Sequence, residues 1–272
     1  MPNSAAPSVT LLDSGEFMVA SANFGVPHPT GYPLWTILSW LFHLLPLGNA
    51  AWEINVFSGV CGALAVGLCG ALLCNIQRWY FPEDLNGRMA WIPTFVSLAF
   101  SLMLAFSESM WSQAVIAEVY TLHALMVALI FITAYMWVRQ PWRDGLMLMT
   151  FFLLALAFSN HHLILSLALS GVPYLLILLL RRRMFLDWLF AGLLTVLLVF
   201  LGFAILSASR STADGVVDPS LLRTAIRFFY CMALAFGLYV WLRRGRVRWR
   251  LVAFLPCAVA LGLLPYAYMP FA

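Results

Sequence analysis

The chain has 272 residues, of which 63% are hydrophobic and only 10% are charged. A soluble domain cannot cover its surface with so few charged side chains, so most of this surface must face lipid. The composition therefore excludes a soluble globular protein and predicts an all-α polytopic membrane protein. The net charge of +4 is the excess of 15 Arg residues over 11 acidic residues. The positions of the Arg residues in the chain explain this charge better than nucleic-acid binding does.

Residues 1–50 form an acidic loop ahead of the long apolar segments. Asp13 and Glu16 lie three residues apart, which puts both carboxylates on one helix face, and His28 follows between two Pro residues. These residue types suit proton transfer beside a membrane. The acidic pair also fits a capping box at the start of a short helix, with Asp in place of the usual Ser or Thr. Both interpretations fit the residues.

A short apolar segment follows at residues 34–47, bounded by Pro33 and Pro46. Because a spanning helix needs ~20 residues, this segment predicts an interfacial helix, in which His43 stands apart from the other His residues. The next span would carry Gly59, Gly62, Gly67 and Gly70 on a face able to pack closely. In all, the sequence predicts about eight transmembrane helices, at residues 51–76, 89–107, 122–138, 146–160, 163–180, 186–207, 224–242 and 251–271.

The Arg residues predict the orientation of these helices, because cytoplasmic loops are enriched in positive charge. Twelve of the fifteen Arg residues fall in alternate loops, and only Arg210, Arg223 and Arg227 fall on the opposite side. Asp13 and the acidic loop then lie on the non-cytoplasmic face, together with any active site. We expect the membrane to be a bacterial inner membrane, or the endoplasmic reticulum if the protein is eukaryotic.

Further candidate residues gather on this predicted outer face. Glu118 enters an apolar segment close to Tyr120 and His123, and a carboxylate there is costly unless it is paired or faces a wet cavity. His161 and His162 are adjacent and point about 100° apart on a helix, so only one of them readily faces a shared cavity. No His or Cys spacing predicts a metal site. The alternative to a substrate role is solvation at the membrane interface.

Arg223 and Arg227 lie one helical turn apart at the predicted outer start of a span. Two guanidinium groups on a side otherwise poor in Arg suggest an anion, and phosphate suits their fork geometry. Snorkelling of both side chains to lipid headgroups explains the pattern equally well.

Two blocks of residues resemble one family of multi-pass membrane proteins. The first block comprises Asp13–Glu16 and Gly25–Leu34, and the second comprises Trp111–Ala114 and Ala117–Leu122. Together they resemble the GT-C membrane proteins related to protein O-mannosyltransferases. The resemblance implies a GT-C-like helical bundle that acts as an inverting glycosyltransferase. Its donor would be a polyprenyl-phosphate sugar, with mannose as the sugar, and its acceptor a hydroxyl of a protein or glycan.

The resemblance also implies roles for the candidate residues. Asp13 would be the general base on the acceptor hydroxyl, and Glu16 or Glu118 would orient the acceptor or hold a cation. Substrate binding would fall to polar side chains around these acids, with Arg or His stabilising the phosphate. These substrate-binding candidates are His28, Tyr120, His161, His162, Arg223 and Arg227. The partners would be the lipid bilayer, the lipid-linked donor and the acceptor, without nucleic acid, and metal dependence stays open.

We expect a single transmembrane domain over residues 1–272, with interfacial helices in 1–50 and the spans in 51–272. Family members have a helix before the acidic loop and a further C-terminal region, so we expect this chain to be a fragment. A transporter or flippase for a lipid-linked or anionic solute is the alternative function. The spans lack the mid-membrane charges that such a protein would need. A non-catalytic membrane scaffold is a third possibility.

Overall fold

The computed structural model of the chain describes residues 5–9, 13–29, 31–81, 89–140, 142–164 and 249–269, together with residues 187, 190–196, 198, 236, 239 and 240. Every regular element within these residues is a helix, which confirms the all-α prediction for the described part of the chain. The chain divides into two compact units. One combines Met1–Leu165 with Gly262–Ala272, and the other is Ser166–Leu261.

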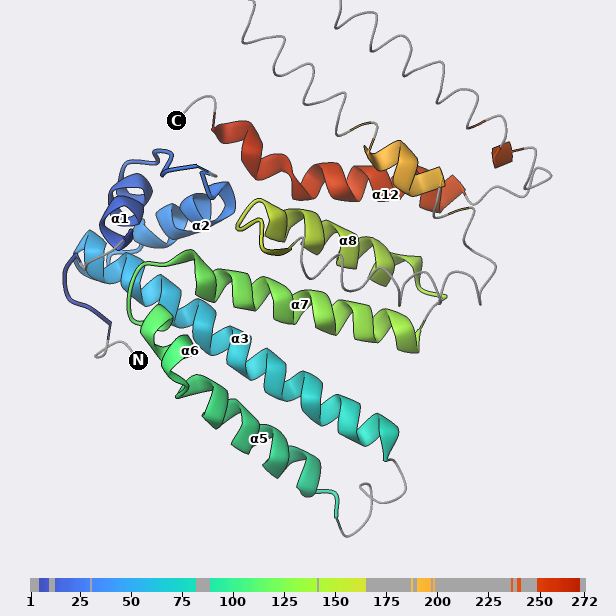
Figure 1. Ribbon diagram of the computed structural model, residues 1–272, viewed down its shortest axis with the longest axis horizontal. Helices are drawn as coiled ribbons and strands as arrows, with labels where there is room; N and C mark the ends of the chain where they lie inside the picture. Colours follow the sequence, from blue (N-terminus) through green and yellow to red (C-terminus); the bar gives the residue numbers. More distant parts are fainter. Residues whose placement is uncertain are drawn as a thin grey trace, which may run out of the picture. The chain divides into compact units, whose positions relative to one another are not determined.

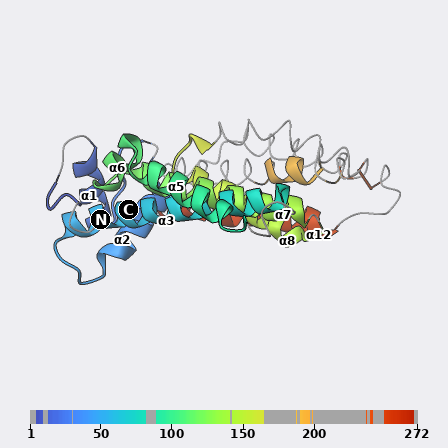
Figure 2. The same cartoon turned by 90° about the horizontal axis from the view of Figure 1, so that it is seen from below.

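Four helices of the first unit lie in one layer, as Figures 1 and 2 show. They are α3 (Ala50–Tyr80), α5 (Ile92–Ala105), α7 (Val119–Arg139) and α8 (Asp144–Phe158). Helix α3 packs between α5 and α7, and α8 packs against α7. Large apolar side chains of α5 are exposed, among them Phe95 at 61% and Met103 at 76%. An exposed apolar face of this kind agrees with a helix that contacts lipid.

Glycine residues let α3 approach its neighbours closely. A Cβ atom added to Gly59 would lie 3.2 Å from the Ala114 carbonyl oxygen, and one added to Gly62 would lie 3.3 Å from the Ala114 Cβ. Ala114 ends α6 (Glu108–Ala114), and Gly70 meets α5 in a similar way. Gly67 has no such neighbour within 4 Å, so the predicted packing face is wrong at that position.

Among the residues that the structure describes, two helices, α3 and α7, are long and apolar enough to cross a membrane. Helices α5 and α6 would add a third span if the pair, which is bent by 63°, is counted as one. The predicted span at 146–160 corresponds to α8, which has 15 residues and is shorter than the ~20 needed for a crossing. The described residues therefore give two or three spans and not the eight predicted.

The last predicted span, 251–271, is also wrong as a single helix. Helix α12 (Trp249–Gly262) has Pro256 inside it, and the 3-10 helix η3 (Leu264–Tyr268) follows. Proline removes a backbone donor, and Gly262 and Pro265 add two further interruptions to the helical ladder. The predicted spans at 163–180, 186–207 and 224–242 lie outside the described residues, apart from isolated positions.

Short helices gather at one end of the layer, which we call the acidic end. Helices α1 (Ser14–Ala22) and α2 (Pro33–His43) pack against each other there, beside the starts of α3 and α7 (Figure 1). Helix α2 also packs against η3. Its 11 residues are too few to cross a membrane, and it ends before Pro46, in agreement with the predicted short helix.

Glu53 ties the end of α2 to the start of α3. Its side chain is buried, and its carboxylate accepts hydrogen bonds from the backbone N–H groups of Leu47 at 3.0 Å and Gly48 at 2.7 Å. His43 Nδ1 donates a third bond at 2.6 Å. These bonds satisfy a buried carboxylate, and we assign Glu53 a structural role in the α2–α3 turn.

The described side chains of the second unit form a small core around Phe190, Tyr239 and Val252. The Tyr239 hydroxyl donates a 2.7 Å hydrogen bond to the carboxylate of Asp187, which is fully buried. This bond compensates part of the cost of burying that carboxylate.

Candidate functional site

Helix α1 is anchored at the acidic end by Phe17, which is buried. The centroid of its ring lies 5.0 Å from that of Trp35, 5.3 Å from that of Tyr32 and 5.5 Å from that of His28. Aromatic pairs at such distances contribute about 0.5–1.5 kcal/mol beyond the burial of their area. The cluster fixes the first turn of α1, which carries the predicted acidic pair.

Asp13 stands at the N-cap position of α1, but its side chain makes no capping hydrogen bond. Its backbone already has helical angles, with φ −73° and ψ −10°, whereas a capping residue usually has extended angles. The capping-box interpretation of Asp13 and Glu16 is therefore wrong. The Asp13 side chain is exposed, which leaves its carboxylate accessible to another group.

Glu16 binds His28 in place of the cap. Its Oε1 accepts from the His28 backbone N–H at 2.6 Å, and its Oε2 accepts from the ring Nδ1 at 2.8 Å. The ring bond is the largest cause that lowers the pKa of Glu16 below the ordinary 4.5. With Nδ1 donating to Glu16, Nε2 of a neutral His28 is an acceptor that faces the Tyr32 hydroxyl at 3.4 Å.

The turn between His28 and α2 requires unusual backbone angles. Gly31 has φ +84°, and a Cβ atom added there would collide with the Met269 side chain. Tyr32, the next residue, also has a left-handed backbone with φ 40°. A non-glycine residue in this region costs on the order of 1–3 kcal/mol, and such residues concentrate at functional sites. The strained backbone places the Tyr32 ring between His28 and His161.

Glu118 lies at the N-cap position of α7 and is only 6% exposed. Three bonds fix its backbone. Ser58 Oγ accepts from the Glu118 N–H at 3.3 Å and donates to the Glu118 carbonyl at 3.4 Å, and Trp35 Nε1 donates to the same carbonyl at 3.1 Å. Sequence reasoning missed Ser58 and Trp35, because they come from α3 and α2 and share no motif with Glu118.

The two acids Asp13 and Glu118 act on each other electrostatically. Burial raises the pKa of the Glu118 carboxyl above its ordinary value of 4.5, and the negative charge of Asp13 raises it further. His28 acts in the opposite direction on the Glu118 pKa, by its positive charge when protonated. Asp13 and His28, which come from two other segments of the chain, therefore both influence the charge state of Glu118.

His161 adds a ring cluster to this site. The centroid of its ring lies 5.7 Å from that of Tyr32, 5.5 Å from that of Tyr120 and 5.6 Å from that of His123. Its Nδ1 accepts from the backbone N–H of Leu163 at 3.1 Å, so a neutral His161 carries its proton on Nε2. Burial, followed by His162, lowers the pKa of His161 and favours this neutral form.

His162 points elsewhere. Its ring stacks on Phe158 at a centroid distance of 4.4 Å, and its Nε2 lies 3.0 Å from the Tyr266 hydroxyl. The two adjacent His residues therefore diverge, and only His161 lies in the ring cluster. The remaining predicted site residues, Arg223 and Arg227, lie outside the described residues.

The described part of the chain contains no group of three or more His, Cys, Asp or Glu side chains that could hold a metal ion. The carboxylates of Glu16 and Glu53 are each occupied by a His and by backbone donors. Asp13 and Glu118 remain as the acids of the site that make no ion pair with a described residue.

Two known proteins match part of this chain. A mouse protein named Protein O-mannosyl-transferase TMEM260 is 29% identical over 175 residues, which are 63% of this chain and 23% of that protein. A Dictyostelium discoideum protein named Protein O-mannosyl-transferase tmem260 is 30% identical over 127 residues, which are 46% of this chain and 14% of that protein. The chain thus spans less than a quarter of either relative. No solved structure matches.

Residues 13–184 match the family described as the Protein O-mannosyl-transferase TMEM260 N-terminal domain. The match starts at Asp13 and contains Glu16, His28, Glu118 and His161. It confirms the relationship to protein O-mannosyltransferases that the two residue blocks indicated. Since this match covers well over half of its residues, the chain belongs to the family of the protein O-mannosyl-transferase TMEM260 N-terminal domain.

Proposed function

We propose that this chain carries the active site of a membrane glycosyltransferase. The enzyme moves mannose from a polyprenyl-phosphate donor to an acceptor hydroxyl on the non-cytoplasmic face. Both matched relatives are named protein O-mannosyl-transferases, which supports the reaction and the sugar. The observation that carries the proposal is the exposed, uncapped Asp13 carboxylate, whose negative charge raises the pKa of the buried Glu118.

In the proposed reaction Asp13 is the general base. Its carboxylate takes the proton from the acceptor hydroxyl as the hydroxyl oxygen bonds to the anomeric carbon of mannose. The bond from that carbon to the phosphate oxygen breaks, and its electron pair leaves with the polyprenyl phosphate. Attack from the side opposite the leaving group inverts the anomeric configuration. Asp13 suits this role because its carboxylate is exposed and makes no capping bond.

Glu118 takes a different role, because its environment differs from that of Asp13. A carboxyl whose pKa is raised by burial stays protonated to a higher pH and can donate a hydrogen bond. We assign Glu118 to orienting the acceptor or sugar as a neutral donor, in preference to holding a cation. Glu16 acts through His28: its two bonds fix the imidazole, so both are positioning residues.

The developing phosphate charge needs donors on the leaving-group side. His161 supports this role with a proton on Nε2, and Tyr120 and Tyr32 enclose its ring. Arg223 and Arg227 are proposed from the sequence alone as the cationic partners of the phosphate. The non-cytoplasmic placement rests on the distribution of Arg between alternate loops.

The test uses membranes that contain the chain of 272 residues. They are incubated with polyprenyl-phosphate mannose labelled in the sugar, and label transferred to protein is counted. The proposal expects transfer by the wild type and its loss in Asp13→Asn. Folded wild-type chain that transfers no label would contradict the proposal and favour a non-catalytic scaffold. Movement of labelled donor across the membrane without transfer would favour a flippase.

A further inference from the structure

An aromatic and basic surface lies at the end of the helix layer opposite the acidic end. Helices α3 and α7 end there, and α5 and α8 begin there (Figure 1). Exposed rings mark these helix ends, namely Tyr80 at the end of α3, Trp91 at 62% before α5 and Trp142 at 74% before α8. Trp and Tyr are enriched where a bilayer meets water, because each ring has an apolar body and a polar group. These rings therefore favour a position at a membrane–water interface.

The length of α7 supports the same position for its last residue, Arg139. The helix has 21 residues, which at about 1.5 Å per residue span about 30 Å, the thickness of the hydrocarbon core of a bilayer. If Glu118, directly before α7, lies at one interface, Arg139 lies at the other. An Arg side chain at that level reaches the lipid headgroups.

Arg139 is held over two aromatic rings. Its guanidinium carbon lies 5.4 Å from the centroid of the Trp79 ring and 5.8 Å from that of the Tyr135 ring, within the ~6 Å range of cation–π attraction. The two rings contact each other edge to face at a centroid distance of 5.5 Å. The Tyr135 hydroxyl donates to the Asn75 carbonyl at 3.0 Å, which fixes this ring between α7 and α3. We call Arg139, Trp79 and Tyr135 the Arg139 cluster.

The Arg139 side chain is exposed and forms no ion pair with a carboxylate in the part of the chain that the structure describes. The ion pairs found there, His28–Glu16 and His43–Glu53, both lie at the acidic end. The two rings stabilise the positive charge but supply no acceptor oxygen. The planar guanidinium therefore keeps N–H donors for an anion.

The other charges at this end also favour an anion. Among the described residues there, the cations Arg78, Arg139 and Arg143 outnumber one acid, Asp144. Arg78 Nη2 donates to Thr94 Oγ1 of α5 at 3.2 Å, so this guanidinium already has a partner. Arg139 is therefore the cation best placed to bind a further group.

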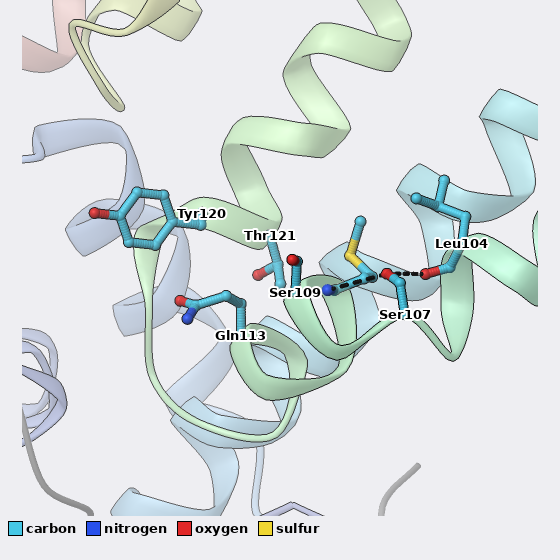
Figure 3. A pocket seen from close by; sticks show the side chains of 7 residues that line it. Leu104, Ser107, Ser109, Gln113, Tyr120 and Thr121 are labelled. Carbon is cyan, nitrogen blue, oxygen red and sulfur yellow. Dashed lines mark hydrogen bonds between the residues drawn. The ribbon is translucent and has the colours of Figure 1, made fainter.

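The cavity of about 160 Å³ near the start of α7 lacks these features (Figure 3). Only uncharged residues line it, among them Ser109, Gln113 and Tyr120. A lipid phosphate is best bound by charged donors, above all by the fork of an Arg side chain. The Arg residues that the structure describes in the first unit all lie at the opposite end of the layer. That end is therefore the better candidate for a phosphate headgroup.

We propose that the Arg139 cluster binds the phosphate headgroup of an anionic phospholipid of the surrounding bilayer. The Arg139 guanidinium donates to the phosphate oxygens, and the rings of Trp79 and Tyr135 hold it in position. The predicted orientation puts this end at the cytoplasmic leaflet, where anionic lipids are concentrated. This lipid site is independent of the proposed transfer reaction.

The test measures lipid binding to the chain of 272 residues in detergent micelles by native mass spectrometry. The probes are dioleoylphosphatidylglycerol and dioleoylphosphatidylcholine, which share their acyl chains but differ in headgroup charge. We expect the wild type to bind the anionic lipid more tightly. Arg139→Gln should reduce this preference about fivefold, the contribution of one Arg near an anionic membrane surface. Trp79→Leu should reduce it by a smaller factor, because the guanidinium then keeps only the Tyr135 ring.

Two matched variants remove the same kinds of group outside the Arg139 cluster. Arg143→Gln removes an exposed cation at the same end, and Trp91→Leu removes an exposed ring that packs on Phe95. Both should keep the preference for the anionic lipid within about twofold of wild type, less than the fivefold loss expected for Arg139. Equal losses in Arg139→Gln and Arg143→Gln would show an unspecific attraction to charge and overturn the site.

The wild type alone also tests the proposal, without any variant that has to fold. Equal binding of the two lipids by the wild type would overturn it. Inorganic phosphate, compared with chloride at the same ionic strength, should not release the anionic lipid. Release by inorganic phosphate would assign the Arg139 cluster to a soluble anion and overturn the lipid assignment.

Discussion

The carboxylate of Glu16 holds His28 by two hydrogen bonds, at 2.6 Å from the backbone N–H and at 2.8 Å from the ring Nδ1. These bonds connect α1 to the strained turn before α2, between two residues that are 12 positions apart in the sequence. They set the tautomer of a neutral His28 and direct its Nε2 toward Tyr32. The pair therefore links the acidic motif to the ring cluster.

Glu16→Gln should lower stability in a pH-dependent way. The pKa of Glu16 is lowered in the folded protein, so its contribution is present above the ordinary pKa of 4.5 and is lost as the pH falls through the lower folded value. The pair is partly exposed, which limits the effect to about 0–1 kcal/mol. Melting temperatures of both proteins in detergent, followed from neutral to acidic pH, should converge. A gap that persists in acid would contradict this assignment.

Ser58→Ala should destabilise the start of α7. The substitution leaves the buried Glu118 N–H without its acceptor, which costs about 1–3 kcal/mol in free energy of unfolding. Ser112→Ala is the control, since its exposed hydroxyl bonds only within α6 at 3.4 Å and should change stability by less than ~0.5 kcal/mol. Equal effects of the two substitutions on urea unfolding would show that Ser58 does not fix Glu118.

The acids of the site could be predicted from the sequence, but their environments could not. Asp13 and Glu118 stand out as acids among apolar residues, and both lie in the candidate site. The position of the Glu118 backbone depends on Trp35 and Ser58, which lie 83 and 60 positions away from it in the sequence. No local pattern encodes contacts at such separations.

Local patterns also misassigned two features. The spacing of Asp13 and Glu16 fits a capping box, yet tertiary contact with His28 gives Glu16 a different partner. Hydropathy alone treated 251–271 as one span, although Pro256 and the residues after it interrupt the helix. Gln113 belongs to a recognised residue block, but only the folded chain places it beside Thr121 in a cavity.

The Glu118→Gln variant distinguishes two possible roles of Glu118, that of a neutral hydrogen-bond donor and that of a cation ligand. Glutamine keeps a hydrogen-bond donor at this position, so mannose transfer should stay within about tenfold of wild type, whereas Glu118→Leu should lose about 100-fold or more. If Glu118 were instead an ionised carboxylate that held a cation, both variants should lose mannose transfer to the same extent. Transfer of labelled mannose in membranes measures this, and equal loss in both variants would contradict the neutral role.

The same variant should also change the pH dependence of stability. The raised pKa of Glu118 means that the folded state disfavours its ionised form. Wild-type stability relative to Glu118→Gln should therefore be greatest below the ordinary pKa of 4.5 and decline as the pH rises through the higher folded value. A relative stability that rises over this range would contradict the burial argument.

Asp13→Asn and Asp13→Ala should have the same effect, because the side chain makes no capping bond that Asn could preserve. Both should leave the free energy of unfolding within ~0.5 kcal/mol of wild type. Both should reduce mannose transfer by about 100-fold or more, since neither side chain can take up a proton. Asp144→Asn, at the start of α8 and outside the candidate site, is the matched control and should retain wild-type transfer.

If Asp13→Asn keeps more than about a tenth of wild-type transfer, the loss is below the scale of a general base. Glu118 would then be the remaining acid of the site, because Glu16 is held by His28.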